Sequence, residues 1–189
     1  MYVIMFLNSY FRKQVSIIME QRSLTYTKQL VYAALGIALV FVCTVFLNLR
    51  LPIAANGGLV HLGNVPLFVI AIFYGRRFGA LAGGIGMALF DLVGGWFIWA
   101  PFTFVIVGLI GYTVGAICEK RDTVTAYILA MVVACIIKVL GYYGAEGLLY
   151  GNWISPAASI PGNIVQIGIA AVIALPIVVK LRKQAKFKR

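Results

Sequence analysis

Long uncharged apolar stretches are the feature of this sequence that most restricts its fold. Residues 29–49 read QLVYAALGIALVFVCTVFLNL, without one charged side chain. A helix needs about 20 apolar residues to cross the hydrocarbon core of a bilayer, and further stretches of the chain approach that length. Only 11% of the 189 residues are charged, whereas soluble domains carry about 25%. The sequence therefore predicts an integral membrane protein and excludes a soluble domain.

These stretches predict an all-α membrane protein with six transmembrane helices. The expected spans are residues 29–49, 62–75, 78–99, 101–118, 124–145 and 159–180. Charged or turn-forming residues separate them, such as Arg76 and Arg77 after the second span and Pro101 before the fourth. The second span is short for a full crossing, so we expect it to be tilted or to begin within an ordered loop.

Basic residues predict how the spans are oriented. In a six-span arrangement, all but two of the 16 Lys and Arg residues fall on one side of the membrane. The exceptions are Arg50 and Lys138. Cytoplasmic loops and tails are enriched in Lys and Arg, so we expect both termini to be cytoplasmic and the chain to lie in the cell membrane.

The spans and their charges also predict how the chain is organised. We expect residues 1–28 to form an N-terminal cytoplasmic or interfacial segment, with translation from Met19 as an alternative to translation from Met1. Residues 29–181 would form the six-helix membrane domain, and residues 182–189 a basic cytoplasmic tail.

The strongly polar groups in or beside the membrane all fall toward the predicted outer face. Charged residues at membrane depth are costly, and they usually face protein or a water-filled cavity. Their common depth indicates a binding pocket that is open to the outside and closed below, and not a continuous channel. The candidate pocket residues are His61, Asn64, Asp91, Lys138, Glu146, Asn163 and Gln166.

Two questions about this pocket stay open at the level of sequence. Asp91 either lines the pocket as an acceptor or pairs with Lys138 and holds it in position; we favour the pairing. Trp96 and Tyr142 are the aromatic residues that we expect to stack against a ligand. The neighbouring aromatic residues fit a membrane-interface belt, where Trp and Tyr are enriched regardless of function.

The sequence lacks the motifs of the common catalytic and metal sites. It contains no Walker loop, no HExxH motif and no nucleophile elbow. His61 is the single histidine, and the three cysteines show no metal-ligand spacing. We therefore expect no metal, no cofactor and no catalytic residue, and any active transport would need a partner that supplies the energy.

Small residues recur at helical spacing in the first span. Ala34 and Ala38 lie four residues apart, with Gly36 between them. Such stripes allow helices to approach closely, either within one chain or against another protein.

Residues 61–115 carry a pattern that suggests a family. The pattern consists of His61-Leu62-Gly63, Gly75, Gly79, Ala82-Gly83, Asp91 with Gly94 or Gly95, and Ala100-Pro101-Phe102. It resembles the substrate-binding S components of energy-coupling factor (ECF) vitamin transporters. Within them it is most similar to the riboflavin-type group, which includes hydroxymethylpyrimidine and pyridoxine carriers.

The resemblance implies a function, partners and a fold. It implies a six-helix, ECF S-component-like bundle that binds a vitamin from the extracellular side with high affinity. Such a subunit associates with a transmembrane T component and two cytoplasmic ATPases, which hydrolyse the ATP. In that family an alanine stripe on the first helix contacts the T component, and Ala34 and Ala38 match it. The loop after the first helix acts as a lid, and residues 51–64 occupy that place.

Substrate identity is the least determined feature. We favour hydroxymethylpyrimidine or a pyridoxine-like vitamin, because such rings suit aromatic stacking and hydrogen bonds from polar side chains. Riboflavin or pantothenate are alternatives; the carboxylate of pantothenate would suit Lys138. Two readings from other classes are a small intramembrane enzyme that acts on lipid and a structural or regulatory membrane protein. The family resemblance implies neither nucleic-acid binding nor catalysis.

Overall fold

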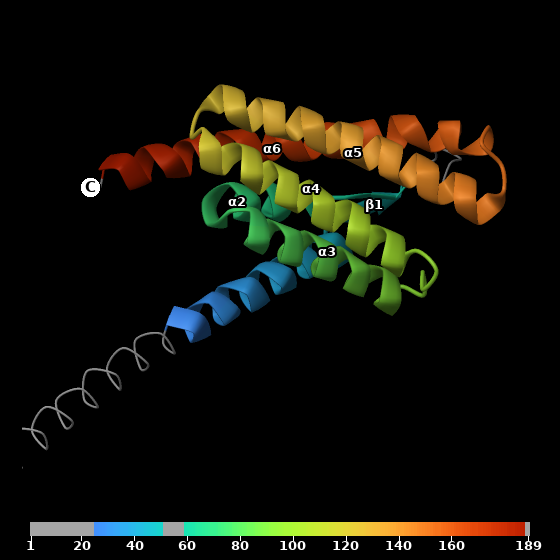
Figure 1. Cartoon of the computed structure of the whole chain (residues 1–189), viewed down its shortest axis with the longest axis horizontal. Helices are drawn as coiled ribbons and strands as arrows, with labels where there is room; N and C mark the ends of the chain where they lie inside the picture. Colours follow the sequence, from blue (N-terminus) through green and yellow to red (C-terminus); the bar gives the residue numbers. More distant parts are fainter. Residues whose placement is uncertain (1–24, 51–58, 188–189) are drawn as a thin grey trace, which may run out of the picture. The chain divides into compact units, whose positions relative to one another are not determined.

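The computed structural model describes residues 25–50 and 59–187 (Figure 1). The predicted N-terminal segment up to residue 24, residues 51–58 of the predicted lid and the last two residues of the tail lie outside the described residues. The chain divides into two units, Met1–Ala34 and Leu35–Arg189. In the first unit, residues 25–34 are helical and form the start of the helix Thr25–Phe46.

The second unit contains the rest of that helix, a short hairpin and a set of longer helices. Its strands β1 (Asn48–Arg50) and β2 (Leu59–His61) are antiparallel, with Asn48 opposite His61. Its helices are α2 (Asn64–Tyr74), α3 (Arg76–Val93), α4 (Ala100–Lys120), α5 (Val124–Tyr150) and α6 (Ile160–Phe187), and a 3-10 turn η2 (Ser155–Ser159) precedes α6. Figure 1 shows α5 running alongside α4, and α5 also packs against α6.

Four helices of the described chain are long and apolar enough to cross a membrane. They are Thr25–Phe46, Ala100–Lys120, Val124–Tyr150 and the segment Ser155–Gln184. The two others are shorter or more polar: α2 has 11 residues and α3 has 18, including two arginines at its start. Length and composition thus support four of the six predicted spans, and a crossing by all six stays a prediction.

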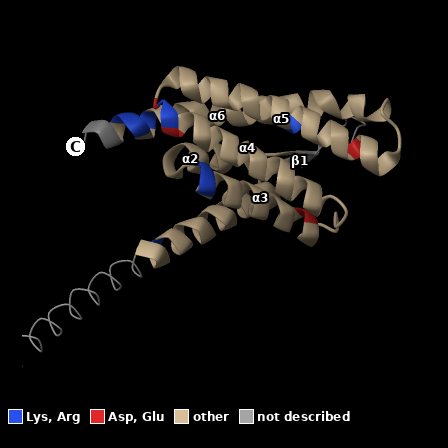
Figure 2. Cartoon of the chain, in the orientation of Figure 1, with Lys and Arg blue, Asp and Glu red and all other residues tan. Residues whose placement is uncertain are grey.

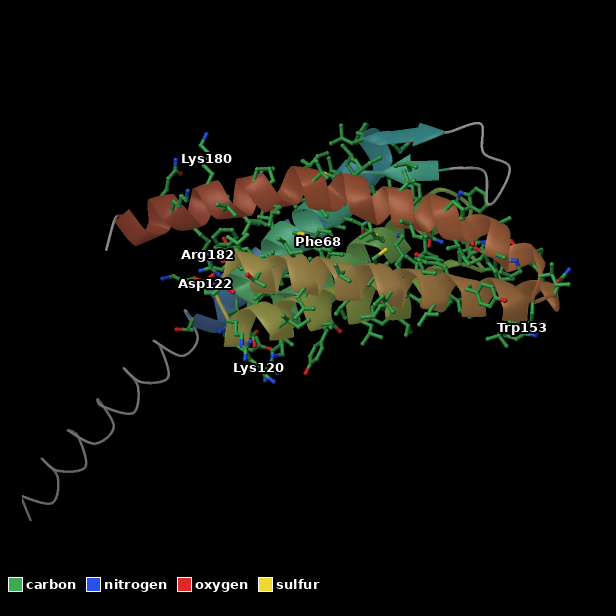
Figure 3. All side chains as sticks on the ribbon, turned by 90° about the horizontal axis from the view of Figure 1, so that it is seen from above. Phe68, Lys120, Asp122, Trp153, Lys180 and Arg182 are labelled. Carbon is green, nitrogen blue, oxygen red and sulfur yellow. The ribbon has the colours of Figure 1, made fainter. Side chains whose placement is uncertain are left out.

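Helix α2 is the short element, and protein covers it. It packs against α3, α4 and α6. Its side chains Leu67, Phe68 and Ala71 are fully buried, and Phe68 lies in the middle of the bundle in Figure 3. At 1.5 Å per residue, α2 is about 17 Å long, far less than the hydrocarbon core of a bilayer. Burial by the longer helices removes its need to span lipid by itself.

Helices α3 and α4 touch backbone to backbone. A Cβ atom placed on Gly111 would lie 2.1 Å from the carbonyl oxygen of Gly79, and one placed on Gly115 would lie 2.4 Å from the backbone nitrogen of Arg76. Any larger side chain at these positions would push the helices apart. The glycines at the contact between α3 and α4 therefore allow close packing within the chain.

The turn between α3 and α4 differs from the predicted boundary. α3 ends at Val93, before the predicted end at residue 99, because two glycines follow it. Gly95 has a φ angle of +80°, a left-handed conformation that glycine adopts without strain. The Trp96 backbone N–H then donates to the Asp91 carbonyl at 2.7 Å, and α4 begins at Ala100.

Candidate ligand-binding site

Polar side chains from four elements of the second unit interact with one another. His61 ends β2, Asp91 lies in the last turns of α3, and Lys138 lies in α5. The charge of Lys138 acts on both His61 and Asp91. We define the polar cluster as these three residues, the Thr103 and Tyr142 side chains that contact them, and Asn64, which lies three residues after His61 at the start of α2. The structure thus brings together residues that the sequence predicted to share one depth.

Asn64, the first residue of α2, is fully buried. Neither its side-chain oxygen Oδ1 nor its nitrogen Nδ2 has a hydrogen-bond partner among the described residues. A buried polar group without a partner costs about 1–3 kcal/mol, and native structures contain few of them. The Asn64 amide is therefore available to both a donor and an acceptor of a ligand.

Asp91 and Lys138 interact without a direct ion pair. The buried Oδ2 atom of Asp91 has no hydrogen-bond partner in residues 25–50 and 59–187, and its carboxylate also interacts with Thr103. Lys138 is only 2% exposed, and its Nζ atom lies 5.0 Å from the centre of the Tyr142 ring. Asp91 and Lys138 interact electrostatically, whereas the ion pairs between described residues join other side chains. That Asp91 holds Lys138 in position stays a prediction.

Aromatic rings flank the lysine. The Tyr142 and Thr103 hydroxyls are 3.2 Å apart and share a hydrogen bond. The Trp99 ring lies 6.3 Å from that of Tyr142, centre to centre. Trp96, which the sequence suggested as a stacking wall, is 43% exposed, and its role stays a prediction.

Thr103 and Trp99 are the two contacts of this cluster that sequence reasoning missed. Thr103 is 4% exposed, although it is a hydroxyl residue within an apolar span. Its position three residues after the Ala100-Pro101 start of α4 could have marked it as facing the same end of the bundle as Asp91. Trp99 is one of the aromatic residues near Trp96 that fit a membrane-interface belt, and no sequence signal separates it from Trp96.

His61 is held in its neutral form. Its ring nitrogen Nδ1 is buried and has no partner among the described residues. Burial, and after it the positive charge of Lys138, lower the pKa of His61 to about 3. At neutral pH the imidazole therefore offers one N–H donor and one nitrogen acceptor.

The remaining candidates lie on α5 and α6. Glu146 and Gln166 are 3% and 5% exposed, and Asn163 is half-buried. Glu146 and Gln166 each make interactions within the protein. A role for these three residues toward a ligand stays a prediction. No group of three His, Cys, Asp or Glu side chains suited to a metal occurs among the residues that the structure describes.

At the opposite end of the bundle, two arginines have direct partners. We call this the basic end; Figure 2 shows its Lys and Arg residues gathered near the α2–α3 turn and the C-terminal part of α6. The Arg76 side chain forms an ion pair with Glu119 at 2.6 Å, and the Arg76 backbone N–H donates to the same carboxylate at 2.8 Å. The α2–α3 turn is thereby tied to the end of α4.

Arg182 of α6 makes a second connection at the basic end. It donates to the Ile72 carbonyl at 2.9 Å, and its Nε atom lies 3.3 Å from Oδ1 of Asp122. Its guanidinium lies 4.6 Å from the centre of the Phe73 ring. In Figure 3 Arg182 and Asp122 lie side by side, with Trp153 at the far end of the molecule. Arg182 therefore joins α6, the end of α2 and the α4–α5 loop.

The predicted docking residues Ala34 and Ala38 are both exposed. Gly36 between them is buried, and a Cβ atom placed on it would lie 3.4 Å from the Cβ of Ala82 in α3. The exposure is compatible with a partner on the alanine stripe but does not test it.

Comparison with known proteins agrees with the architecture. A solved structure of the S component of a bacterial ECF transporter has a TM-score of 0.66 against this chain at 18% identity. It covers 87% of this chain and 99% of that one. The thiamine precursor transporter HmpT of Lactococcus lactis subsp. cremoris is 31% identical over 147 residues, which are 78% of this chain and 83% of that protein.

Two further findings cover much of the sequence. An uncharacterized Pyrococcus woesei protein is 36% identical over 102 residues, 54% of this chain and 68% of that protein. The family described as "ECF-type riboflavin transporter, S component" matches residues 25–183. Members of that family are subunits of membrane transporters and not enzymes. The chain therefore belongs to the S components of ECF-type transporters, the membrane subunits of vitamin uptake.

Proposed function

We propose that the chain captures a small heteroaromatic vitamin or vitamin precursor, hydroxymethylpyrimidine or a pyridoxine-like compound, at the polar cluster. The observation that carries this proposal is the set of buried polar atoms within the polar cluster that have no hydrogen-bond partner among the described residues: Oδ1 and Nδ2 of Asn64, Nδ1 of His61 and Oδ2 of Asp91. Each atom loses its hydration on folding, and a bound ligand would restore the lost hydrogen bonds.

The chemistry of the cluster suits a flat polar ring. Tyr142 and Trp99 offer ring faces, and the neutral His61 and the Asn64 amide offer both donors and acceptors. Trp96, Glu146, Asn163 and Gln166 complete the proposed ligand set in a second group of contacts. The similarity to a thiamine precursor transporter supports a pyrimidine.

We propose that a partner complex provides the energy for transport. In this proposal a T component docks on Ala34 and Ala38 of the first helix, and two cytoplasmic ATPases hydrolyse ATP. The binding site faces the outside, and both termini face the cytoplasm. The distribution of basic residues supports this orientation, because the Lys and Arg residues of the described chain gather at one end of the bundle and cytoplasmic segments are enriched in them.

The first experiment identifies the ligand directly. The full chain would be purified in detergent from cells grown in rich medium, denatured and analysed by mass spectrometry for small molecules. We expect about one equivalent of a pyrimidine or pyridine vitamin compound per chain. If riboflavin or pantothenate were found instead, the proposed substrate would be wrong, but the proposed role as the vitamin-binding subunit would stand. An empty protein that no B-group vitamin stabilises against heat would contradict the proposal.

A second experiment separates docking from binding. Ala38→Trp places a bulky side chain on the stripe, and Leu39→Trp is the matched control, because Leu39 is 50% exposed on the same helix. We expect Ala38→Trp to abolish cellular uptake and to leave the ligand affinity of the purified chain unchanged. Uptake at the level of the Leu39→Trp control would remove the docking assignment.

A further inference from the structure

Asp91 and Lys138 carry opposite charges in one buried cluster but are kept apart. The Lys138 ammonium lies over the Tyr142 ring at 5.0 Å, while Oδ2 of Asp91 is buried without a hydrogen-bond partner among the described residues. A lysine side chain has four rotatable bonds, so a direct pair with a neighbouring carboxylate would normally form. The pair is absent from the ion pairs of the described residues, so the two groups do not satisfy each other directly.

The contacts around the pair explain the separation. The Asp91 carboxylate interacts with Thr103, the Thr103 hydroxyl bonds that of Tyr142 at 3.2 Å, and the Tyr142 ring attracts the Lys138 ammonium. This chain of contacts runs from α3 through α4 to α5. It fixes an acceptor at one end and a cationic donor at the other, instead of allowing them to neutralise each other.

We propose that Asp91 and Lys138 together recognise a ligand edge on which a hydrogen-bond donor adjoins an acceptor. The ligand's N–H donates to Oδ2 of Asp91, and a ring nitrogen accepts from the ammonium of Lys138. An aminopyrimidine has this edge, because its exocyclic amino group adjoins a ring nitrogen. The inference rests on the proposed function and adds to it the two residues that select an amino-substituted ring.

The charges of the pair also determine what is rejected. An anionic ligand would gain from Lys138 but would be repelled by Asp91, and a cationic ligand would meet the reverse. A neutral ring with a polarised edge satisfies both groups at once. A ring that lacks the amino group would leave the Asp91 carboxylate buried and unpaired, which is the strongest form of discrimination that a polar site offers.

The test compares two probes on the wild-type chain purified in detergent. The probes are hydroxymethylpyrimidine and its analogue in which hydrogen replaces the amino group, with affinities from titration calorimetry. We expect the analogue to bind at least about 100-fold more weakly. Affinities within about tenfold of each other would overturn the proposal. This comparison needs no variant and so does not depend on the folding of one.

A variant then assigns the preference to Asp91. Asp91→Asn keeps the shape but replaces a charge-assisted hydrogen bond with a neutral one, so we expect the preference for the amino compound to shrink to about tenfold or less. Asp122→Asn, at the basic end, is the matched control and should retain the wild-type preference. A preference that Asp91→Asn leaves intact would overturn the role of Asp91.

The outcomes also separate this inference from the proposed function. Binding of riboflavin or pyridoxine without any binding of hydroxymethylpyrimidine would keep the transport role and overturn the aminopyrimidine edge. A wild-type chain that binds none of the three rings would overturn both.

Discussion

The basic end and the polar cluster both contain basic and acidic side chains, but within the described chain these side chains form direct ion pairs only at the basic end. At the basic end, Arg76 bonds Glu119 through both its backbone and its guanidinium, and Arg182 reaches a carbonyl, a carboxylate and a ring. In the polar cluster, Asp91 and Lys138 lie near each other without pairing directly.

The difference separates stability from function. The paired charges of Arg76 and Arg182 at the end of the bundle tie helices together. Buried groups without partners destabilise the empty protein and bind whatever restores their hydrogen bonds. Variants in the polar cluster should therefore lower ligand affinity, whereas variants at the basic end should lower the free energy of unfolding.

The largest effect is expected from Lys138→Met. Methionine keeps the length of the side chain but removes the ammonium, so the affinity for hydroxymethylpyrimidine should fall about 100-fold or more. The melting temperature of the ligand-free chain should stay the same or rise, because a buried charge without a direct partner has been replaced by an apolar group. Titration calorimetry and thermal unfolding in detergent measure the two quantities.

Lys120→Met is the control for this change, since Lys120 is exposed at the basic end. It should leave both affinity and melting temperature unchanged. If Lys138→Met bound its ligand like the wild type, the two regions would not differ in the way that we infer.

Arg182→Met should give the opposite result. It removes the hydrogen bond to Ile72 and the contacts with Asp122 and Phe73, so we expect the free energy of unfolding to fall by about 1–2 kcal/mol. The ligand affinity of the folded chain should remain within about threefold of wild type. Lys180→Met, an exposed neighbour on α6, is the control and should change stability by less than about 0.5 kcal/mol. A large loss of ligand affinity in Arg182→Met would show that the basic end affects ligand binding, which would contradict the separation of the two regions.

The pH dependence of stability should report on His61. The folded chain keeps its pKa near 3, whereas the unfolded chain binds a proton near the ordinary value of 6.5. The contribution of the neutral imidazole to stability is therefore complete above pH 6.5 and is lost as the pH falls below it. The ligand-free wild type should lose about 1 kcal/mol relative to His61→Gln between pH 7.5 and pH 5.5. If the unfolding free energies of the two proteins changed equally between pH 7.5 and pH 5.5, the His61 ring would take up a proton in the folded chain as well, which would contradict the prediction.

The smallest effect is expected from Glu119→Gln. The Arg76–Glu119 pair is more than one-third exposed on both sides, so its charge contributes little, and glutamine keeps an acceptor for the Arg76 N–H groups. We expect a loss of about 0.5 kcal/mol in unfolding free energy and no change in affinity. A loss of unfolding free energy as large as that of Arg182→Met would mean that the Arg76–Glu119 pair contributes as much to stability as the Arg182 contacts do.

The sequence was sufficient for the features that depend on local composition. The apolar stretches located the helices, and Asp91 and Lys138 stood out because charges are rare at membrane depth. The family followed from the order and spacing of motifs between His61 and Phe102, and the match over residues 25–183 confirms it.

The contacts between helices were beyond reach of the sequence. They depend on how each helix is rotated about its axis, which no single span encodes. The sequence predicts a pairing of Asp91 and Lys138 but not the contacts that run between them through Thr103 and Tyr142. Likewise, the ring contact between Trp99 and Tyr142 joins the start of α4 to α5, and no pattern in the sequence marks it.

The shortness of α2 has a consequence for the biogenesis of the protein. A ribosome delivers α2 to the membrane before α4 and α6, the helices that later cover it. Until then, a helix of about 17 Å cannot rest stably across the bilayer. Stable insertion of the α2–α3 hairpin therefore depends on synthesis of the C-terminal half of the chain. Membrane integration and tertiary folding are, for this segment, one event.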